Sequence, residues 1–175
     1  TGAGMSGSLG FGLDALQAFG LQLFAIDRPG LGRSTPHPGK TLTTWADDVS
    51  HLVSGQRLRD TVAVGFSQGA PFALALAGAG LVDAVAVVAG QDEFPAVRGL
   101  LQPDVAAMVT AAETDPDGFE ATIAGAATAD WLWSLILDMS AGHDRELYTG
   151  ALGAAYRRSL DEGFAAGAAG YARDL

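Results

Sequence analysis

The residues best suited to chemistry are Gly65–Gly69, within the stretch "VAVGFSQGAPFALAL". The pattern G-x-S-x-G, between an apolar strand and a helix, predicts a sharp turn that holds its central serine in a strained conformation with the hydroxyl exposed. A glycine two positions to either side is needed because strand and helix crowd this turn. We therefore predict that Ser67 is a nucleophile. An ordinary strand-to-helix turn with a surface serine is the alternative.

A second stretch, the opening "TGAGMSG", supports two different interpretations. Gly2, Gly4 and Gly7 fit G-x-G-x-x-G, the loop that places a dinucleotide pyrophosphate at a helix N-terminus. A helix candidate and a strand candidate follow, and the strand ends in Asp27, where a ribose-binding carboxylate would lie. The same opening residues can instead form the turn of an oxyanion hole.

A third stretch, "FAIDRPGLGRS", places the turn-rich loop Asp27–Ser34 at the end of a predicted strand. Taken in order, the opening turn, this loop and the Gly65–Gly69 turn resemble the α/β-hydrolase family with a serine nucleophile. The resemblance covers most of the chain. It implies a partial hydrolase core over residues 1–95, a helical cap over residues 96–175, and a structural turn at Asp27. The dinucleotide interpretation explains only the first 27 residues.

The resemblance also implies roles for individual residues. Ser67 matches the nucleophile, and the backbone N–H groups of Gln68 and Ala3 match the two oxyanion donors. Each such donor is worth on the order of 3 kcal/mol of the barrier. The sequence departs from the family at the opening turn, where Thr1 replaces the usual histidine and Gly4-Met5 stands in place of Pro-Gly.

A serine hydroxyl also needs a base, and the chain offers no clear candidate. Its histidines are His37, in a loop, His51, on a predicted helix, and His143, between helical segments. Asp92 and Glu93, which follow an apolar strand, are candidate acids. The family supplies its acid and histidine after later strands, so we expect both to lie outside this chain.

The start of the sequence favours the same interpretation. The chain begins with Thr1 and its first methionine is Met5, inside the glycine-rich turn. We therefore expect these 175 residues to be an internal portion of a larger hydrolase. No basic segment precedes an apolar one near the start, so no signal peptide is visible and a cytoplasmic location is expected.

The elements that must position these residues form an α/β pattern. Short apolar runs predict strands at Leu21–Asp27, Thr61–Gly65 and Ala84–Ala89, and the last two lack alternation, as strands covered on both faces do. Helical patterns separate them, which predicts a mostly parallel sheet with flanking helices. From about residue 96 onward the strands disappear, and Asp-Pro, Asp-Gly and Gly breaks separate helical segments.

The helix between the first two predicted strands has a clear apolar face. Trp45, Val49, Leu52 and Val53 recur at helical spacing. Thr44 and Asp47 have the spacing of a capping box, which predicts that the helix begins at Thr44.

Composition excludes several classes of function. Ten Lys and Arg against twenty Asp and Glu give a net charge of −10, so binding to nucleic acid or an anionic membrane is not expected. The chain is 49% hydrophobic, which suits a globular protein, but its apolar runs are too short to span a bilayer. It has no cysteine, which excludes disulfides, thiolate catalysis and cysteine-based zinc sites.

The substrate is predicted only as a class. Serine at the turn leaves esters, thioesters, amides, some C–C cleavages and cofactor-free peroxidation as reactions, and nothing in the sequence points to a metal or an organic cofactor. Six apolar side chains could line an acyl pocket: Phe66, Phe94, Trp131, Leu132, Trp133 and Leu135. We expect most of them to pack in the core instead. We therefore expect a small, partly apolar ester or amide. A non-catalytic hydrolase-like binding module and a dinucleotide-binding domain are the alternatives.

Overall fold

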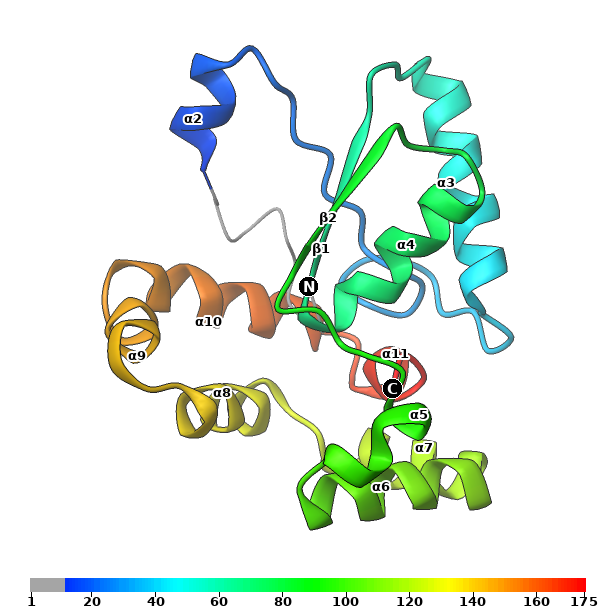
Figure 1. The fold of residues 1–175 in the computed structure, drawn as a ribbon, viewed down its shortest axis with the longest axis vertical. Coiled ribbons are helices and arrows are strands. Elements are labelled where there is room, and N and C mark those ends of the chain that lie inside the picture. The colour runs from blue at the N-terminus through cyan, green and yellow to red at the C-terminus, as the bar shows by residue number, and fades with distance from the viewer. Residues whose placement is uncertain (1–11) are drawn as a thin grey trace. The chain divides into compact units, whose positions relative to one another are not determined.

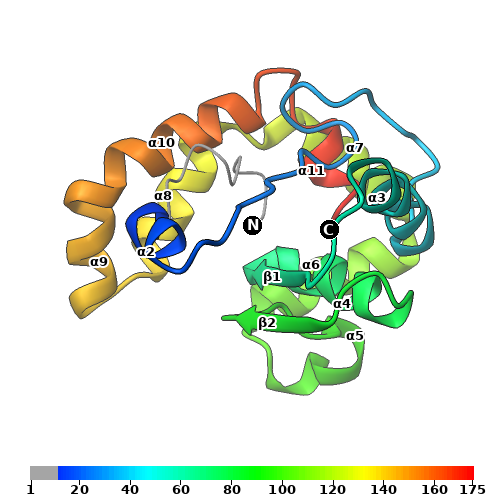
Figure 2. The ribbon, with the colours of Figure 1, turned by 90° about the horizontal axis from the view of Figure 1, so that it is seen from above.

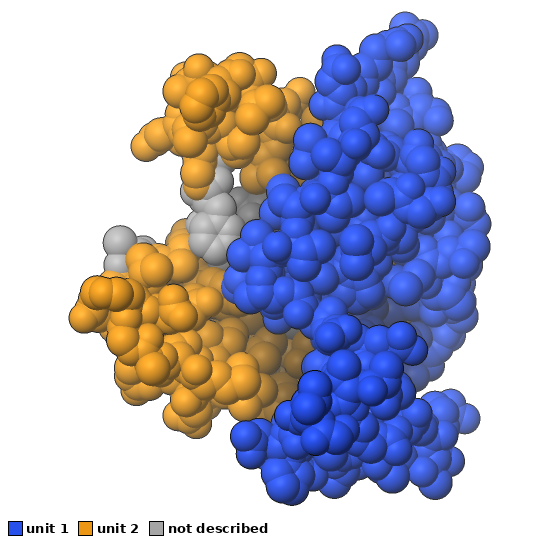
Figure 3. Space-filling view, viewed as in Figure 1, with its two compact units in different colours: residues 1–2, 37–122, 173–175 blue, residues 3–36, 123–172 orange. Residues whose placement is uncertain are grey.

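The structure is a computed structural model that describes residues 12–175. The chain folds as two compact units, each built from segments distant in sequence (Figure 3). Their residues are 1–2, 37–122 and 173–175 for the first unit, and 3–36 and 123–172 for the second. The boundary expected near residue 95 lies inside the first unit, and the division into core and cap stays a prediction.

The first unit contains the parallel pair β1 (Val62–Phe66) and β2 (Ala84–Val88), which lie side by side in Figure 1. Their register runs from Val62 opposite Ala84 to Phe66 opposite Val88. Both strands agree with the sequence prediction to within one residue at each end. The pair is parallel because a helix connects the strands, as the α/β pattern requires.

The strand expected at Leu21–Asp27 is not present, and that prediction was wrong. Residues 21–27 have no regular secondary structure, and among the described residues β1 and β2 pair only with each other. The apolar pattern is there, with Leu21 and Phe24 exposed to 60% and 41%. A strand, however, exists only where a neighbour pairs with its backbone, and the pattern alone supplies no neighbour.

Two helices build the core next to the strands. Helix α4 (Ala70–Gly78) contacts both strands, and α3 (Leu42–Gln56) packs against α4 (Figure 1). Trp45 and Val49 of α3 are buried with Leu76 of α4, which confirms the predicted apolar face. The Trp45 indole N–H also donates to the Phe72 carbonyl at 3.1 Å, so this polar group is paired inside the core.

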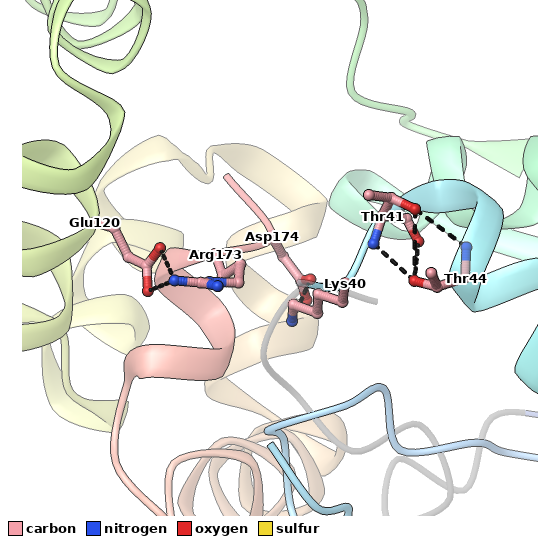
Figure 4. Close-up of polar contacts among 6 residues, drawn as sticks. All are labelled: Lys40, Thr41, Thr44, Glu120, Arg173 and Asp174. Carbon is pink, nitrogen blue, oxygen red and sulfur yellow. Dashed lines mark hydrogen bonds and ion pairs between the residues drawn. The ribbon is translucent and has the colours of Figure 1, made fainter. Parts of the chain in front are cut away.

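Helix α3 begins earlier than the sequence predicted. Its capping box joins Thr41 and Thr44: the Thr44 N–H donates to the Thr41 hydroxyl at 3.1 Å, and the Thr41 N–H donates to the Thr44 hydroxyl at 2.8 Å (Figure 4). The predicted pair of Thr44 and Asp47 was therefore wrong. Threonine at the third helical position replaced the glutamate that the pattern normally requires.

Short helices follow β2 in the first unit. They are α5 (Phe94–Val97), the 3-10 turn η2 (Arg98–Leu100), α6 (Pro103–Thr114) and α7 (Pro116–Ala126), whose last residues belong to the second unit. The C-terminal residues also join the first unit through ion pairs (Figure 4). The Lys40 ammonium lies 2.5 Å from the Asp174 carboxylate, with both side chains buried, and the Arg173 guanidinium contacts both carboxylate oxygens of Glu120.

The regular secondary structure in the described part of the second unit is helical. Its helices are α2 (Leu13–Ala18), α8 (Ala129–Met139), α9 (Gly142–Thr149), α10 (Ala151–Gly163) and α11 (Ala169–Ala172) (Figures 1 and 2). Helix α10 contacts α8 and α9 through the rings of Trp133, Tyr148 and Tyr156, whose centroids lie 5.4–6.3 Å apart. The sequence predicted this helical region, and Gly150 is the break between α9 and α10.

A glycine contact fixes the turn-rich loop in the second unit. A Cβ on Gly170 would lie 2.2 Å from the Gly30 carbonyl oxygen, so only glycine allows this approach. Gly30 has a φ of 81°, a conformation that glycine adopts without strain. Within residues 12–175, no helix has the length and apolar character needed to cross a membrane.

Candidate active site at the end of strand β1

The predicted nucleophile lies where β1 ends and the chain turns into helix. Ser67 follows the last strand residue, Phe66, and opens the 3-10 turn η1 (Ser67–Gly69), which leads into α4. Its φ is 52°, in the left-handed region that side chains disfavour, and the residue is exposed. The strained, exposed serine that the G-x-S-x-G pattern predicts is thus present in the backbone geometry.

Gly65 is required by the packing of this turn. A Cβ at this position would lie 2.7 Å from the Ala70 Cα and 2.8 Å from the Gly69 carbonyl oxygen. Both are backbone atoms that cannot move aside, so β1 and the start of α4 approach each other closely only because Gly65 has no side chain. This crowding is the one that the sequence pattern predicts.

Gln68 follows Ser67 and is 4% exposed. Its side-chain amide has no hydrogen-bond partner, at either the nitrogen or the oxygen, among the residues that the structure describes. A buried amide without a partner destabilises a protein by about 1–3 kcal/mol relative to a paired one. The backbone N–H of Gln68 lies in the first turn after the strand, the position expected of an oxyanion donor.

The turn after β2 contacts the predicted nucleophile directly. The Gln91 N–H donates to the Ser67 carbonyl at 3.1 Å. Ala89, two residues before Gln91, has a φ of 45°. The sequence contains no signal for this feature, since alanine is not a residue that usually marks a left-handed conformation.

None of the three histidines is bonded to Ser67 in the described structure. His37 is an exposed loop residue. The His51 Nδ1 lies 2.8 Å from the Asp47 carbonyl, one turn earlier on α3, and the His143 Nδ1 lies 3.2 Å from a Glu146 carboxylate oxygen in the second unit. His51 therefore bonds within its own helix, and His143 pairs with a carboxylate of its own helix.

The candidate acids follow Gln91 in an exposed loop. The Glu93 N–H donates to the Asp92 carboxylate at 2.8 Å, so this carboxylate caps its own loop. Neither carboxylate forms an ion pair with a described histidine, so neither is paired as the acid of a triad within residues 12–175.

Asp27 has a structural role in the second unit. The Ser34 hydroxyl donates to the Asp27 carbonyl at 2.7 Å, and the Arg33 N–H donates to its carboxylate at 3.4 Å. These bonds close the loop Asp27–Ser34 and support the structural-turn interpretation over a ribose ligand. Gly2, Ala3, Gly4 and Gly7 lie outside the described residues, so the second oxyanion donor and the dinucleotide loop stay predictions.

The apolar residues considered for an acyl pocket fall in both units. Phe66 and Phe94 belong to the first unit, and the candidates on α8 belong to the second. There, Trp131 packs edge-on against Tyr171, and Trp133 packs against Tyr148 and Tyr156. Of the six candidates only Leu132 is buried, whereas Trp131 and Leu135 are exposed, so the expectation that most of them pack in the core was wrong.

Among the described residues, the largest pKa shift belongs to Tyr156, which packs against Trp133 and Tyr148. Burial raises the pKa of the Tyr156 hydroxyl to about 12, with smaller contributions from Tyr148 and Tyr171. Burial, followed by the charge of Asp144, raises the pKa of Tyr148. Among the described residues no group of three or more His, Asp or Glu side chains is placed to hold a metal ion.

In this chain a strand of a parallel pair ends at a strained, exposed serine, and the serine leads directly into a helix. A strand–serine–helix turn of this kind is the nucleophile turn of serine hydrolases with an α/β fold. The chain belongs to the alpha/beta hydrolase family, whose family model matches residues 2–175. No solved structure matches the chain. Membership confirms the resemblance and the fold class, a parallel α/β core followed by helices, and it indicates hydrolase activity.

Proposed function

We propose that this chain carries the nucleophile of a serine hydrolase that cleaves carboxylic esters, thioesters or amides through an acyl-enzyme at Ser67. The observation that carries the proposal is the positive φ of Ser67, 52°, at an exposed turn made possible by Gly65. Strained backbone of this kind concentrates at functional sites, because the surrounding structure must stabilise it. Family membership supports the general class of reaction.

In the proposed reaction the Ser67 Oγ attacks the substrate carbonyl carbon while a base takes the hydroxyl proton. The carbonyl oxygen becomes an oxyanion, which the N–H groups of Gln68 and Ala3 stabilise. Collapse of the tetrahedral intermediate expels the alcohol, thiol or amine with a proton from the base. Water then attacks the acyl-enzyme by the same route, releases the acid and restores Ser67.

The base and its acid belong, in this proposal, to residues outside the chain. The observation that favours this is the local bonding of His51 and His143 and the absence of a described histidine bonded to Ser67. A serine without a base reacts slowly, since its hydroxyl is a weak nucleophile at neutral pH. The same observation favours a second candidate function, a binding module that keeps the fold without catalysis.

The substrate proposed is a small, partly apolar ester or amide, and no nucleic acid is involved. The net charge of −10 supports this, because it opposes binding of polyanions. For the same chain we propose a cytoplasmic location.

A fluorophosphonate probe tests the proposal on the full 175-residue chain. The serine oxygen displaces fluoride from phosphorus, and intact mass reports the adduct. We expect one adduct per chain that disappears in Ser67→Ala and persists in Ser54→Ala, a change at an exposed serine of α3. We also expect added imidazole to accelerate the labelling, because it supplies the base.

Each outcome decides between the candidates. An adduct that persists in Ser67→Ala overturns the nucleophile. Absence of an adduct even with imidazole favours the binding module. Rapid labelling that imidazole does not change places the base within the chain and overturns that part of the proposal.

A further inference from the structure

The turn that follows β2, Ala89–Gln91, has an unusual backbone with no local explanation. Ala89 is one of four non-glycine residues with positive φ in the described structure. Two of the others, Arg57 and Asp60, lie at the end of α3 and in the bend before β1, and the fourth is Ser67. Alanine has no polar side chain to compensate for this conformation, so the surrounding structure must impose it.

Ala89 and Ser67 occupy equivalent positions in the two strands. The last pair of the parallel ladder is Phe66 opposite Val88, and each of these residues is followed directly by a residue with positive φ. The backbone therefore leaves both strands at the same register position, and in both places through a residue with positive φ. The turn after β2 also lies close to α4, because a Cβ on Gly90 would be 2.9 Å from the Ala70 Cβ.

One hydrogen bond joins the two turns, from the Gln91 N–H to the Ser67 carbonyl at 3.1 Å. The Ser67 carbonyl and the Gln68 N–H belong to the same planar peptide group. The described chain has no cis peptide bond, so these two groups point in opposite directions. The Ala70 N–H at the end of the 3-10 turn also donates to this carbonyl. The Gln91 bond is therefore the second of two bonds that fix the direction of the Ser67 carbonyl and, with it, the direction of the Gln68 N–H.

We propose that the turn Ala89–Gln91 is a positioning element for the oxyanion donor: its backbone directs the Gln91 N–H at the Ser67 carbonyl and so holds the Gln68 N–H in place. This inference rests on the proposed function and adds residues that do not touch the substrate. It explains why an alanine is held at positive φ beside the predicted nucleophile. Its effect falls on the step in which the oxyanion develops.

Ala89→Val tests the proposal, with Ala86→Val as the matched control. Valine strongly disfavours positive φ, so the first change forces the turn to rearrange. Ala86 is an exposed residue within β2, opposite Val64, where a branched side chain suits the strand. Each variant adds the same two methyl groups, so the comparison separates the effect of disturbing the turn from the effect of a larger side chain.

The first readout is the imidazole-assisted rate at which the fluorophosphonate labels Ser67. We expect Ala89→Val to slow it by about 100-fold, the typical effect of losing one oxyanion donor, while Ala86→Val stays within about twofold. The dependence on probe concentration should show a lower maximal rate with little change in the half-saturating concentration. Labelling of a folded Ala89→Val at the normal rate overturns the proposal.

The second readout, hydrogen exchange of the Gln91 amide, does not depend on catalysis. We expect this amide to be protected in the native chain and in Ala86→Val, and to lose protection in Ala89→Val. An amide that exchanges freely in the native chain overturns the proposal, whether or not Ser67 reacts. If Ser67 does not label in any variant, the proposed function fails while the exchange data still decide the positioning role.

A third variant, Ala89→Gly, covers the case in which Ala89→Val does not fold. Glycine accepts positive φ without strain, so the bond from Gln91 should persist. We expect protection of the Gln91 amide and the labelling rate to lie closer to the native chain than to Ala89→Val. A glycine variant with a freely exchanging Gln91 amide overturns the proposal.

Discussion

Gly65 and Ala70 approach so closely that a Cβ on Gly65 would lie 2.7 Å from the Ala70 Cα. We expect Gly65→Ala to destabilise the protein by about 1–3 kcal/mol, because the strand or the helix must shift to admit the methyl group. Ser67 should also become less reactive, since the turn that holds it is displaced. Denaturant unfolding and fluorophosphonate labelling measure the two effects.

Gly55→Ala is the control for that change. Gly55 lies in α3 with nothing within 4 Å of an added Cβ, so alanine there should stabilise the helix by about 0.5–1 kcal/mol. Equal effects of the two substitutions would contradict the packing argument at Gly65.

The capping box of α3 gives a second prediction. Thr41→Ala removes the hydroxyl that accepts the Thr44 N–H and should lower the free energy of unfolding by about 1 kcal/mol. Thr43→Ala, in the same turn but with an exposed side chain outside the capping box, should leave stability within about 0.5 kcal/mol. If Thr43→Ala were as costly as Thr41→Ala, the loss could not be assigned to the capping box, because alanine favours a helix more than threonine does.

The unpaired amide of Gln68 gives a third prediction. Gln68→Met keeps the shape of the side chain and removes two buried polar groups that have no partner among residues 12–175, so the melting temperature should stay equal or rise. Gln56→Met, at the exposed end of α3, serves as the control for the added thioether. A clear loss of stability in Gln68→Met alone would mean that an ordered water pairs with the amide.

The free energy of unfolding should depend on pH in the alkaline range, because Tyr156 is buried. Burial raises its pKa from the ordinary value of 10.0 to about 12 in the folded protein. Between these two values the unfolded chain has lost the proton that the folded chain keeps, so stability falls as the pH rises through this window. The full effect of a two-unit shift is roughly 2–3 kcal/mol.

Unfolding at several pH values, with tyrosinate absorbance recorded alongside, measures this dependence. Tyr156→Phe should remove most of the fall in stability, because phenylalanine does not titrate. A native chain in which all three tyrosines ionise near pH 10 would contradict the prediction.

The buried ion pair of Lys40 and Asp174 gives a fifth prediction. Asp174→Asn removes the carboxylate from a buried ammonium and should cost about 3–5 kcal/mol in the free energy of unfolding. Asp48→Asn, at an exposed position of α3, should change it by less than about 0.5 kcal/mol. The double variant Lys40→Met with Asp174→Leu should recover most of the loss, and failure to recover would assign the effect to packing.

The sequence predicted those parts of the site that depend on local residue chemistry. The spacing of Gly65, Ser67 and Gly69 was enough to predict the strained turn, because the crowding and the conformation arise within a few residues. The apolar runs of β1 and β2 predicted two strands for the same reason. The helical segments after residue 96 were also predictable, since their periodicity and breaks are local.

The features that the sequence did not predict depend on distant partners. The stretch Leu21–Asp27 has the composition of a strand, but pairing needs a neighbour that composition does not specify. Thr41 was missed as the helix start because its partner in the capping box is a threonine. The bond from Gln91 to Ser67 joins two backbone groups, which any pair of residues would supply, so no pattern of side chains indicates it.

The ion pair of Lys40 and Asp174 has a consequence for synthesis of the protein. The ribosome makes Lys40 long before it makes Asp174, the buried carboxylate partner of Lys40. While translation continues, α3, α4 and the two strands are present without the residues that complete their unit. The nascent chain therefore keeps its first unit incomplete until Asp174 has been made, and slower translation of residues 123–174 should prolong its dependence on chaperones.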